Sequence, residues 1–376
     1  MFTYRVPLSR PDISKDEQEA VLDVLKTPYL SLGPKLDQFE KDITNYIGVK
    51  YAVGVNSGTS ALHLIVRAAG IRDGDEVITT PFSFIASSNC ILFERAKPVF
   101  VDIDPDTLNI DPGKIEEKIT KKTKAILAVD VFGHPADWDL LKRIAKKHKL
   151  FLIEDSAEAL GSEFKGRKCG SFGEAGVLAF YPNKQITTGE GGMILTNNKN
   201  IARLCRLMRS QGVERKDRWL EHKTLGYNYR LNEMSCAMGI VQLRRMGKML
   251  KKRNSVALAY DSKLKNIDGL ELPYTAPNVR VNKFVYVVRL SEKYSQRGRD
   301  EILTQMQGRG VQCSNYFPSI HLQPLYRKLF GYKKGGFPVC ESVSQRTIAL
   351  PFYNNLKESD MDYVVKNLRE LIKNHK

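Results

Sequence analysis

The sequence lacks the features that mark several classes of protein. Its six cysteines are far apart, with no C-x-x-C pair and no Cys/His cluster at zinc-ligand spacing. We therefore expect reduced, buried thiols, with neither disulfides nor a metal site. The first residues lack the apolar core of a signal peptide, and no stretch reaches the apolar length of a membrane span. These absences predict a cytoplasmic protein with no membrane partner.

Acidic residues are in short supply relative to basic ones. The chain has 59 Lys and Arg against 42 Asp and Glu, a formal net charge of +17. Such a bias favours anionic partners, which include nucleic acid, acidic lipid and phosphorylated small molecules. The densest basic clusters, 203–209 and 244–253, lie in helix-like segments and are typical of solvated helix faces. No helix-turn-helix or aromatic-basic signature is present, so we expect no nucleic-acid partner; a basic regulatory protein is the non-enzymatic alternative.

Short apolar runs alternate with helical patterns over the first two-thirds of the chain, which predicts an α/β fold with a mostly parallel sheet. No repeat or Gly/Ser linker interrupts this order. After about residue 257 the pattern changes, and we expect a large domain over 1–250 and a smaller α/β domain over 251–376. The expected strands are 51–55, 76–79, 98–101, 125–129, 150–153, 177–180, 193–196 and 283–290. The expected helices are 60–69, 138–148, 201–210, 299–308 and 360–373.

Small polar residues separate the first of these strands from the helix that follows it. Ser57, Gly58 and Thr59 stand at this point. The start of a helix offers free backbone N–H groups and a favourable dipole, so it can bind a phosphate. Glycine lets the backbone approach the anion closely, while the hydroxyls add donors. Simple capping of a structural helix is the alternative interpretation.

Two carboxylates, Glu154 and Asp155, end a later apolar strand. Ligands bind at the carboxyl ends of parallel strands, where Asp155 is expected. A carboxylate there can pair with a pyridinium nitrogen and keep it protonated, which makes the ring an electron sink. Helix capping or metal binding would also account for the pair.

A single lysine, Lys184, lies in the loop between two expected strands, and Gly189, Gly191 and Gly192 follow it. The glycines permit a tight turn and close backbone approach. A partly desolvated lysine has a lowered pKa, so its free amine can attack an aldehyde. Neither the GxxxxGK[ST] loop nor a GxGxxG fingerprint after a strand is matched.

Taken together, these segments resemble the DegT/DnrJ/EryC1/StrS family of sugar aminotransferases. The resemblance covers most of the chain in family order. Its motifs are SGTSAL (57–62), PFSFIAS (81–87), VDIDPDTLNIDP (101–112), EDSAEALG (154–161), NKQITTGEGG (183–192), GYNYR (226–230) and FPSIHLQP (317–324). It implies an aspartate-aminotransferase-like (fold type I) homodimer that binds pyridoxal 5'-phosphate (PLP) between its two domains.

The resemblance also implies a role for individual residues. Lys184 matches the lysine that holds PLP covalently, and Asp155 matches the partner of the pyridine nitrogen. Ser57, Gly58 and Thr59 match the phosphate-binding turn. Phe84 matches the aromatic residue stacked on the ring, and Asn228 matches an asparagine that reaches the phosphate from the neighbouring subunit. Tyr316 and His321 lie in a segment that approaches the substrate in relatives. We also expect Glu158 beside the cofactor and Asn183 and Arg230 at the substrate, with the dimer interface as the alternative for Arg230.

The chain departs from the family pattern at two positions. Ala179 stands where relatives commonly have a serine that contacts the phosphate, so one contact needs another donor. Glu158 stands where many relatives have glutamine or histidine, and a second carboxylate near the ring would alter the titration of its neighbours.

The expected reaction is a transamination in two halves. Glutamate gives its amino group to the cofactor, which then aminates the ketone of a nucleotide-linked sugar for polysaccharide or glycoconjugate synthesis. Lys184 moves the proton. A cyclitol or another cyclic ketone is the alternative substrate. A related sugar 3-dehydratase has histidine in place of the lysine, and Lys184 argues against that activity.

Overall fold

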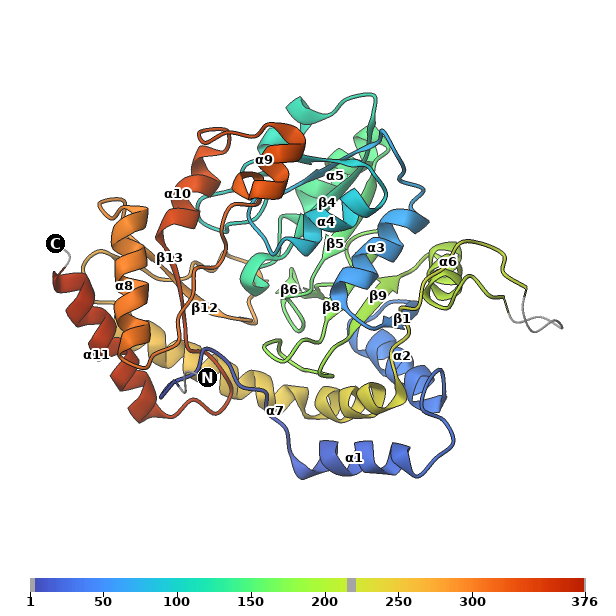
Figure 1. Cartoon of the computed structure of the whole chain (residues 1–376), viewed down its shortest axis with the longest axis horizontal. Coiled ribbons are helices and arrows are strands. Elements are labelled where there is room, and N and C mark those ends of the chain that lie inside the picture. Colours follow the sequence, from blue (N-terminus) through green and yellow to red (C-terminus); the bar gives the residue numbers. More distant parts are fainter. Residues whose placement is uncertain (1–3, 215–220, 375–376) are drawn as a thin grey trace.

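The computed structural model describes residues 4–214 and 221–374. Its centre is a seven-stranded sheet in the order β1-β9-β8-β5-β4-β2-β3 (Figure 1). Neighbours are parallel from β3 to β8, whereas β9 is antiparallel to both β8 and β1. Six strands therefore share one direction. The bounds are β1 (Tyr51–Val55), β2 (Glu76–Thr79), β3 (Lys97–Phe100), β4 (Thr123–Val129), β5 (Phe151–Asp155), β8 (Ala175–Ala179) and β9 (Gly192–Thr196).

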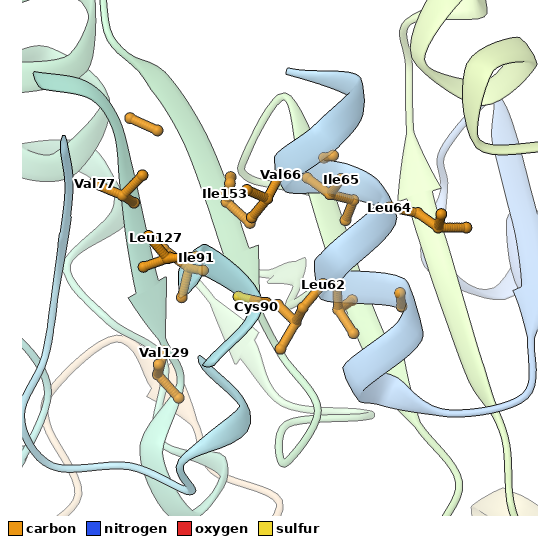
Figure 2. Close-up of a cluster of buried hydrophobic side chains, with 14 of the residues drawn as sticks. Leu62, Leu64, Ile65, Val66, Val77, Cys90, Ile91, Leu127, Val129 and Ile153 are labelled. Carbon is orange, nitrogen blue, oxygen red and sulfur yellow. The ribbon is translucent and has the colours of Figure 1, made fainter. Parts of the chain in front are cut away.

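Both faces of this sheet are buried, as expected for a mostly parallel sheet. On one face, Leu127 and Val129 of β4 pack against helices α3 (Gly58–Ala68) and α4 (Ala86–Phe93), as Figure 2 shows. The alternate residues of the same strand, Ile126 and Ala128, pack on the opposite face against α5 (Trp138–His148). Helix α6 (Lys199–Arg209) extends the first layer beside α3.

Helix α7 (Glu233–Leu264) is 32 residues long and joins the two ends of the molecule (Figure 1). Its first half packs on α1 (Lys15–Leu25) and α2 (Pro34–Ile47). Its last turns enter a separate core with the second sheet, through Tyr260 and Leu264. The expected domain boundary between 250 and 251 falls inside this helix and stays a prediction.

The second sheet has three antiparallel strands, in the order β10-β12-β13. Helices α8 and α11 pack on it and enclose its core. A third, small sheet pairs β11 with β6 and β7. The bounds of these strands are β6 (Glu163–Phe164), β7 (Arg167–Lys168), β10 (Leu270–Glu271), β11 (Val279–Arg280), β12 (Tyr286–Leu290) and β13 (Thr347–Leu350). The remaining helices are α8 (Gln296–Gly308), α9 (Pro324–Phe330), α10 (Pro338–Arg346) and α11 (Glu358–Asn374).

The expected α/β architecture is confirmed, and most expected elements lie within two residues of their observed bounds. The largest differences are β12, which begins three residues later than expected, and α8, which begins three residues earlier. Helices α1, α2, α4, α9 and α10, most of α7, and strands β6, β7, β10, β11 and β13 were not expected as such. Among the described residues, every helix is too short or too polar to cross a lipid bilayer.

Phe39 anchors α2 between the sheet and α7. Its side chain is fully buried, its ring centroid is 5.3 Å from that of Phe180, and a Cβ added to Gly239 of α7 would lie 2.6 Å from its Cζ. We expect Phe39→Ala to lower the free energy of unfolding by about 3–5 kcal/mol, measured by chemical denaturation, because truncation leaves a cavity. Leu258→Ala, at an exposed position of α7, should change it by about 0.5 kcal/mol or less. Equal effects of the two substitutions would contradict this account of the core.

Candidate active site

A cavity of about 530 Å³ lies at the carboxyl edge of the main sheet. The loops after β1, β2, β5 and β8 contribute to its wall, as the rule for open α/β sheets anticipates. Phe284, which precedes β12, and residues 315–318, which lie between α8 and α9, close it on the side of the second sheet. The residues predicted from sequence that line it are Ser57, Gly58, Thr59, Phe84, Asp155, Glu158, Asn183, Lys184 and Tyr316.

The turn at the start of α3 forms one end of the cavity. Ser57 is the N-cap residue, and its Oγ accepts a hydrogen bond of 3.0 Å from the amide of Ser60. Both the capping and the ligand-binding interpretation of this segment are therefore compatible with its geometry. A Cβ added to Gly58 would lie 2.9 Å from Ala179 Cβ, and one added to Gly192 would lie 2.8 Å from the Gly58 nitrogen and closer still to the Ser57 carbonyl. The turn is thus clamped between β8 and β9, with the unpaired amides of a helix start beside the cavity.

Asp155 ends β5 and is almost fully buried. Its Oδ2 accepts a hydrogen bond of 2.7 Å from Ser87 Oγ, and its Oδ1 accepts one of 3.1 Å from the Ala157 amide. Burial raises the pKa of Asp155, while these two hydrogen bonds and the charge of Lys184 oppose the rise. A cationic group in the cavity would therefore stabilise the ionised form of this acid.

Lys184 stands in the loop after β8 with only 12% of its side chain exposed. Its Nζ lies 3.6 Å from Glu158 Oε1 and 3.9 Å from the ring centroid of Phe284. Burial lowers the pKa of Lys184, and the charges of Glu158 and Asp155 act against that shift. A desolvated lysine of this kind can act as a nucleophile or exchange a proton, as the sequence suggested.

Three other expected residues also line the cavity. Phe84 exposes 59% of its surface, so one face of its ring is available to a ligand. Tyr316 is half-buried, and burial raises the pKa of its hydroxyl. Asn183 has a buried Oδ1 that has no hydrogen-bond partner among the described residues.

Asn228, Arg230 and His321 do not line the cavity of the same chain. Asn228 is exposed and pairs with Ser210 in an isolated bridge, and Arg230 Nη1 lies 3.4 Å from the Ser210 hydroxyl. His321 is fully buried, with Nε2 3.0 Å from Glu341 Oε1. Burial lowers the pKa of His321 although Glu341 raises it. The roles expected for these three residues stay predictions.

Several lining residues were missed by the sequence analysis. Ser87, which positions Asp155, lies within the PFSFIAS motif and could have been found there. Phe284 and Asn315 flank strands of the second sheet, and no local motif connects them to the lysine loop. The other missed lining residues include Ser83, Tyr181, Glu190 and Pro318.

A second acidic cluster lies on the other side of β5. Donor atoms of Asp130, Glu154 and Cys169 lie within 4.8 Å of one another, and all three residues are buried. Both carboxylates already accept hydrogen bonds from the protein. Asp130 accepts one of 3.0 Å from Trp138 Nε1, and Glu154 accepts one of 2.5 Å from the Phe172 amide. This cluster therefore braces the loops around β5, and the expectation of no metal site stays a prediction.

The chain is similar in sequence and in structure to known proteins over nearly its whole length. The chain is 36% identical to a GDP-perosamine synthase of Caulobacter vibrioides, covering 98% of each sequence. It superposes with a TM-score of 0.93 on PseC of Helicobacter pylori, an aminotransferase involved in the biosynthesis of pseudoaminic acid, at 32% identity and over 98% and 99% of the two chains.

A third relative was solved with its cofactor. The PLP form of Spr1654 of Streptococcus pneumoniae, a putative sugar aminotransferase, superposes with a TM-score of 0.94 at 27% identity, over 99% of this chain and 100% of that one. The expected fold class, aspartate-aminotransferase-like (fold type I), is confirmed by these likenesses. Residues 11–369 match the family directly, and the chain therefore belongs to the DegT/DnrJ/EryC1/StrS aminotransferase family.

Proposed function

We propose that this chain is a PLP-dependent aminotransferase that transfers an amino group, from glutamate, to the ketone of a nucleotide-linked sugar. The observation that carries the proposal is the convergence of three groups on one cavity. These are the buried amine of Lys184, the buried carboxyl of Asp155 and the helix-start turn at Ser57–Thr59.

The residues present fit PLP. The turn clamped by Gly192 suits a phosphate, because glycine backbone and free amides can approach the anion closely. Asp155 suits the protonated ring nitrogen, whose positive charge would favour the ionised carboxylate. Ala179 has no hydroxyl to offer the phosphate. We expect the side chains of Ser57 and Thr59, which also line the cavity, to make that contact in its place.

When bound, PLP supplies an electron sink for the carbanion charge that develops during transamination. The side chains of this chain supply the rest. Asp155, oriented by Ser87, holds the proton on the ring nitrogen. Lys184 Nζ moves a proton to and from the reacting carbon, and the burial of this amine keeps competing water away. Phe84 supports one face of the ring by offset stacking.

Charge and relatives support a nucleotide-linked sugar as the substrate. A net charge of +17 favours a phosphorylated substrate. The name GDP-perosamine synthase specifies a GDP-linked product for one relative. A keto-sugar linked to a nucleoside diphosphate is phosphorylated and resembles that product. Parallel assays with such sugars and with an inosose distinguish a nucleotide-sugar substrate from a cyclitol.

We further propose a homodimer with shared sites, in which Asn228 serves the cavity of the neighbouring subunit. In support, Asn228 is exposed and lies outside the cavity of its own chain. The carbonyl of the adjacent Tyr229 accepts a hydrogen bond of 2.9 Å from the Asn56 amide, so this segment is fixed against the strand that leads into the phosphate turn.

Lys184→Ala should abolish covalent capture of PLP. In the unaltered protein, borohydride reduction should leave a cofactor adduct on Lys184, detected by peptide mass spectrometry. We expect Lys184→Ala to lower transamination by a factor of at least about 10²–10⁴ through loss of the proton-transfer group. Lys142→Ala removes another lysine whose pKa burial lowers, outside the cavity, and should retain the adduct. An adduct on a different lysine would refute the assignment.

Gly192→Ala should weaken PLP binding by about tenfold or more, because its methyl group would push the Ser57–Gly58 turn out of place. The affinity is measured by equilibrium titration of the cofactor-free protein, followed by absorbance. Gly247→Ala places a methyl group on α7 with no atom within 4 Å and should leave the affinity unchanged. Tight PLP binding by Gly192→Ala would remove the turn from the site.

Mixing Lys184→Ala with Asn228→Ala subunits should restore activity. In each heterodimer, one cavity has both defects and the other has Lys184 from one chain and Asn228 from the other. We expect the mixture, after dissociation and reassociation, to exceed the summed activities of the two separate variants. A mixture no more active than that sum would show that Asn228 does not act across a dimer interface.

A further inference from the structure

Glu158 lies beside Lys184 in the cavity and has no role in the reaction described so far. Its side chain is 5% exposed, and its Oε1 lies 3.6 Å from Lys184 Nζ. Two oppositely charged groups this close form a pair when both are ionised. If one proton moves across the gap, both become neutral.

The backbone holds this carboxyl group in place. The Phe132 amide donates a 2.9 Å hydrogen bond to Oε2, the oxygen farther from the lysine. Phe132 has a φ of 56°, in the left-handed region that bulky residues rarely adopt, so the loop keeps an unfavourable conformation that presents this amide. The Glu158 carbonyl accepts a 2.6 Å hydrogen bond from Gln185 Nε2, which ties the acid to the residue next to the lysine.

Asp155 is less suited to exchange a proton with Lys184. Both of its oxygens already accept hydrogen bonds, from Ser87 Oγ and from the Ala157 amide. Its role at the ring nitrogen also requires that it remain ionised. Glu158 Oε1, by contrast, lies within a small side-chain rotation of hydrogen-bond distance to Nζ.

We propose that Glu158 is the proton acceptor for the Lys184 ammonium group. The Nζ–H bond breaks, the proton moves to Oε1, and the ammonium–carboxylate pair becomes an amine beside a carboxylic acid with no change in total charge. The amine is then ready to attack an aldehyde. The inference rests on the proposed function, because it explains how a lysine with only 12% of its side chain exposed loses its proton.

The electrostatics of the cavity support this transfer. Burial raises the pKa of Glu158 and lowers that of Lys184, so both shifts bring the neutral pair closer in free energy to the ion pair. Burial also raises the pKa of Tyr316 and of Cys90, which lies near Asp155, so both stay protonated near neutral pH. The charges of Glu158 and Asp155 and the ring face of Phe284 stabilise the ammonium form, so the ion pair is the resting state from which the proton moves.

The test measures the titration of Lys184 without any cofactor. The full-length chain, freed of carbonyl compounds with hydroxylamine, is acetylated competitively with acetic anhydride over a range of pH. The Lys184 peptide is then quantified by mass spectrometry. Burial lowers the pKa of Lys184, and the charge of Glu158 opposes that effect. Glu158→Gln removes this charge, so it should move the midpoint for Lys184 to lower pH by about 1–3 units.

Glu190→Gln is the matched control, since it removes an exposed carboxylate that lines the same cavity. It should leave the midpoint nearly unchanged. An unchanged or raised midpoint in Glu158→Gln would overturn the proposal. If this variant does not fold, Glu158→Asp, which withdraws the carboxylate by one methylene, should shift the midpoint in the same direction by less, and no shift would equally refute the inference.

Because the reagent needs no PLP, the two proposals can fail separately. A normal titration shift in a protein that never captures PLP would contradict the proposed function and leave the proton pair intact. Capture of PLP on Lys184 with no titration shift would contradict the proton pair alone.

Discussion

The placement of one amine beside two buried acids at the edge of the main sheet is the constraint on which the site depends. Lys184 is held close to Glu158 and within the electrostatic reach of Asp155, and all three groups are buried. Burial of a charge is costly unless a partner compensates it, so each group controls the protonation of the others. The surrounding hydrogen bonds separate their tasks. Those from Ser87 and Ala157 favour an ionised Asp155, while Glu158 keeps one oxygen next to the amine.

The main sheet explains why these groups meet. Parallel strands end at a common edge, so residues that follow β1, β5 and β8 come together although they are far apart in sequence. Core packing on both faces of β4 and its neighbours makes that edge rigid. The close approach of β9 at Gly192 then determines the path of the turn at Ser57–Thr59. The long helix α7 links this framework to the second sheet, whose Phe284 closes the cavity over the lysine.

Much of this could be predicted from sequence, because its signals are local. Strand 51–55, the turn at Ser57–Thr59 and the acid at the end of β5 follow from apolar runs and the polar residues that end them. The glycines that follow Lys184 indicate the tight loop in which it lies. The cofactor, and the part each residue plays, came from the family resemblance and not from spacing.

Other features have no local signal. Phe284 and Asn315 enter the cavity only because the second sheet packs against the first. Helix α7 was underestimated because its two halves bury different faces in different cores, which weakens any single periodicity. His321 lies buried beside Glu341 and Phe337, which no local pattern indicated, and its contact with substrate stays a prediction.

The most direct test of the central claim is a crystal structure of the full-length protein with PLP. The account predicts the phosphate at the Ser57–Thr59 turn, the ring nitrogen within hydrogen-bond distance of Asp155, and continuous electron density from the cofactor to Lys184 Nζ. A phosphate bound elsewhere, or a ring nitrogen that faces Glu158 in place of Asp155, would contradict it.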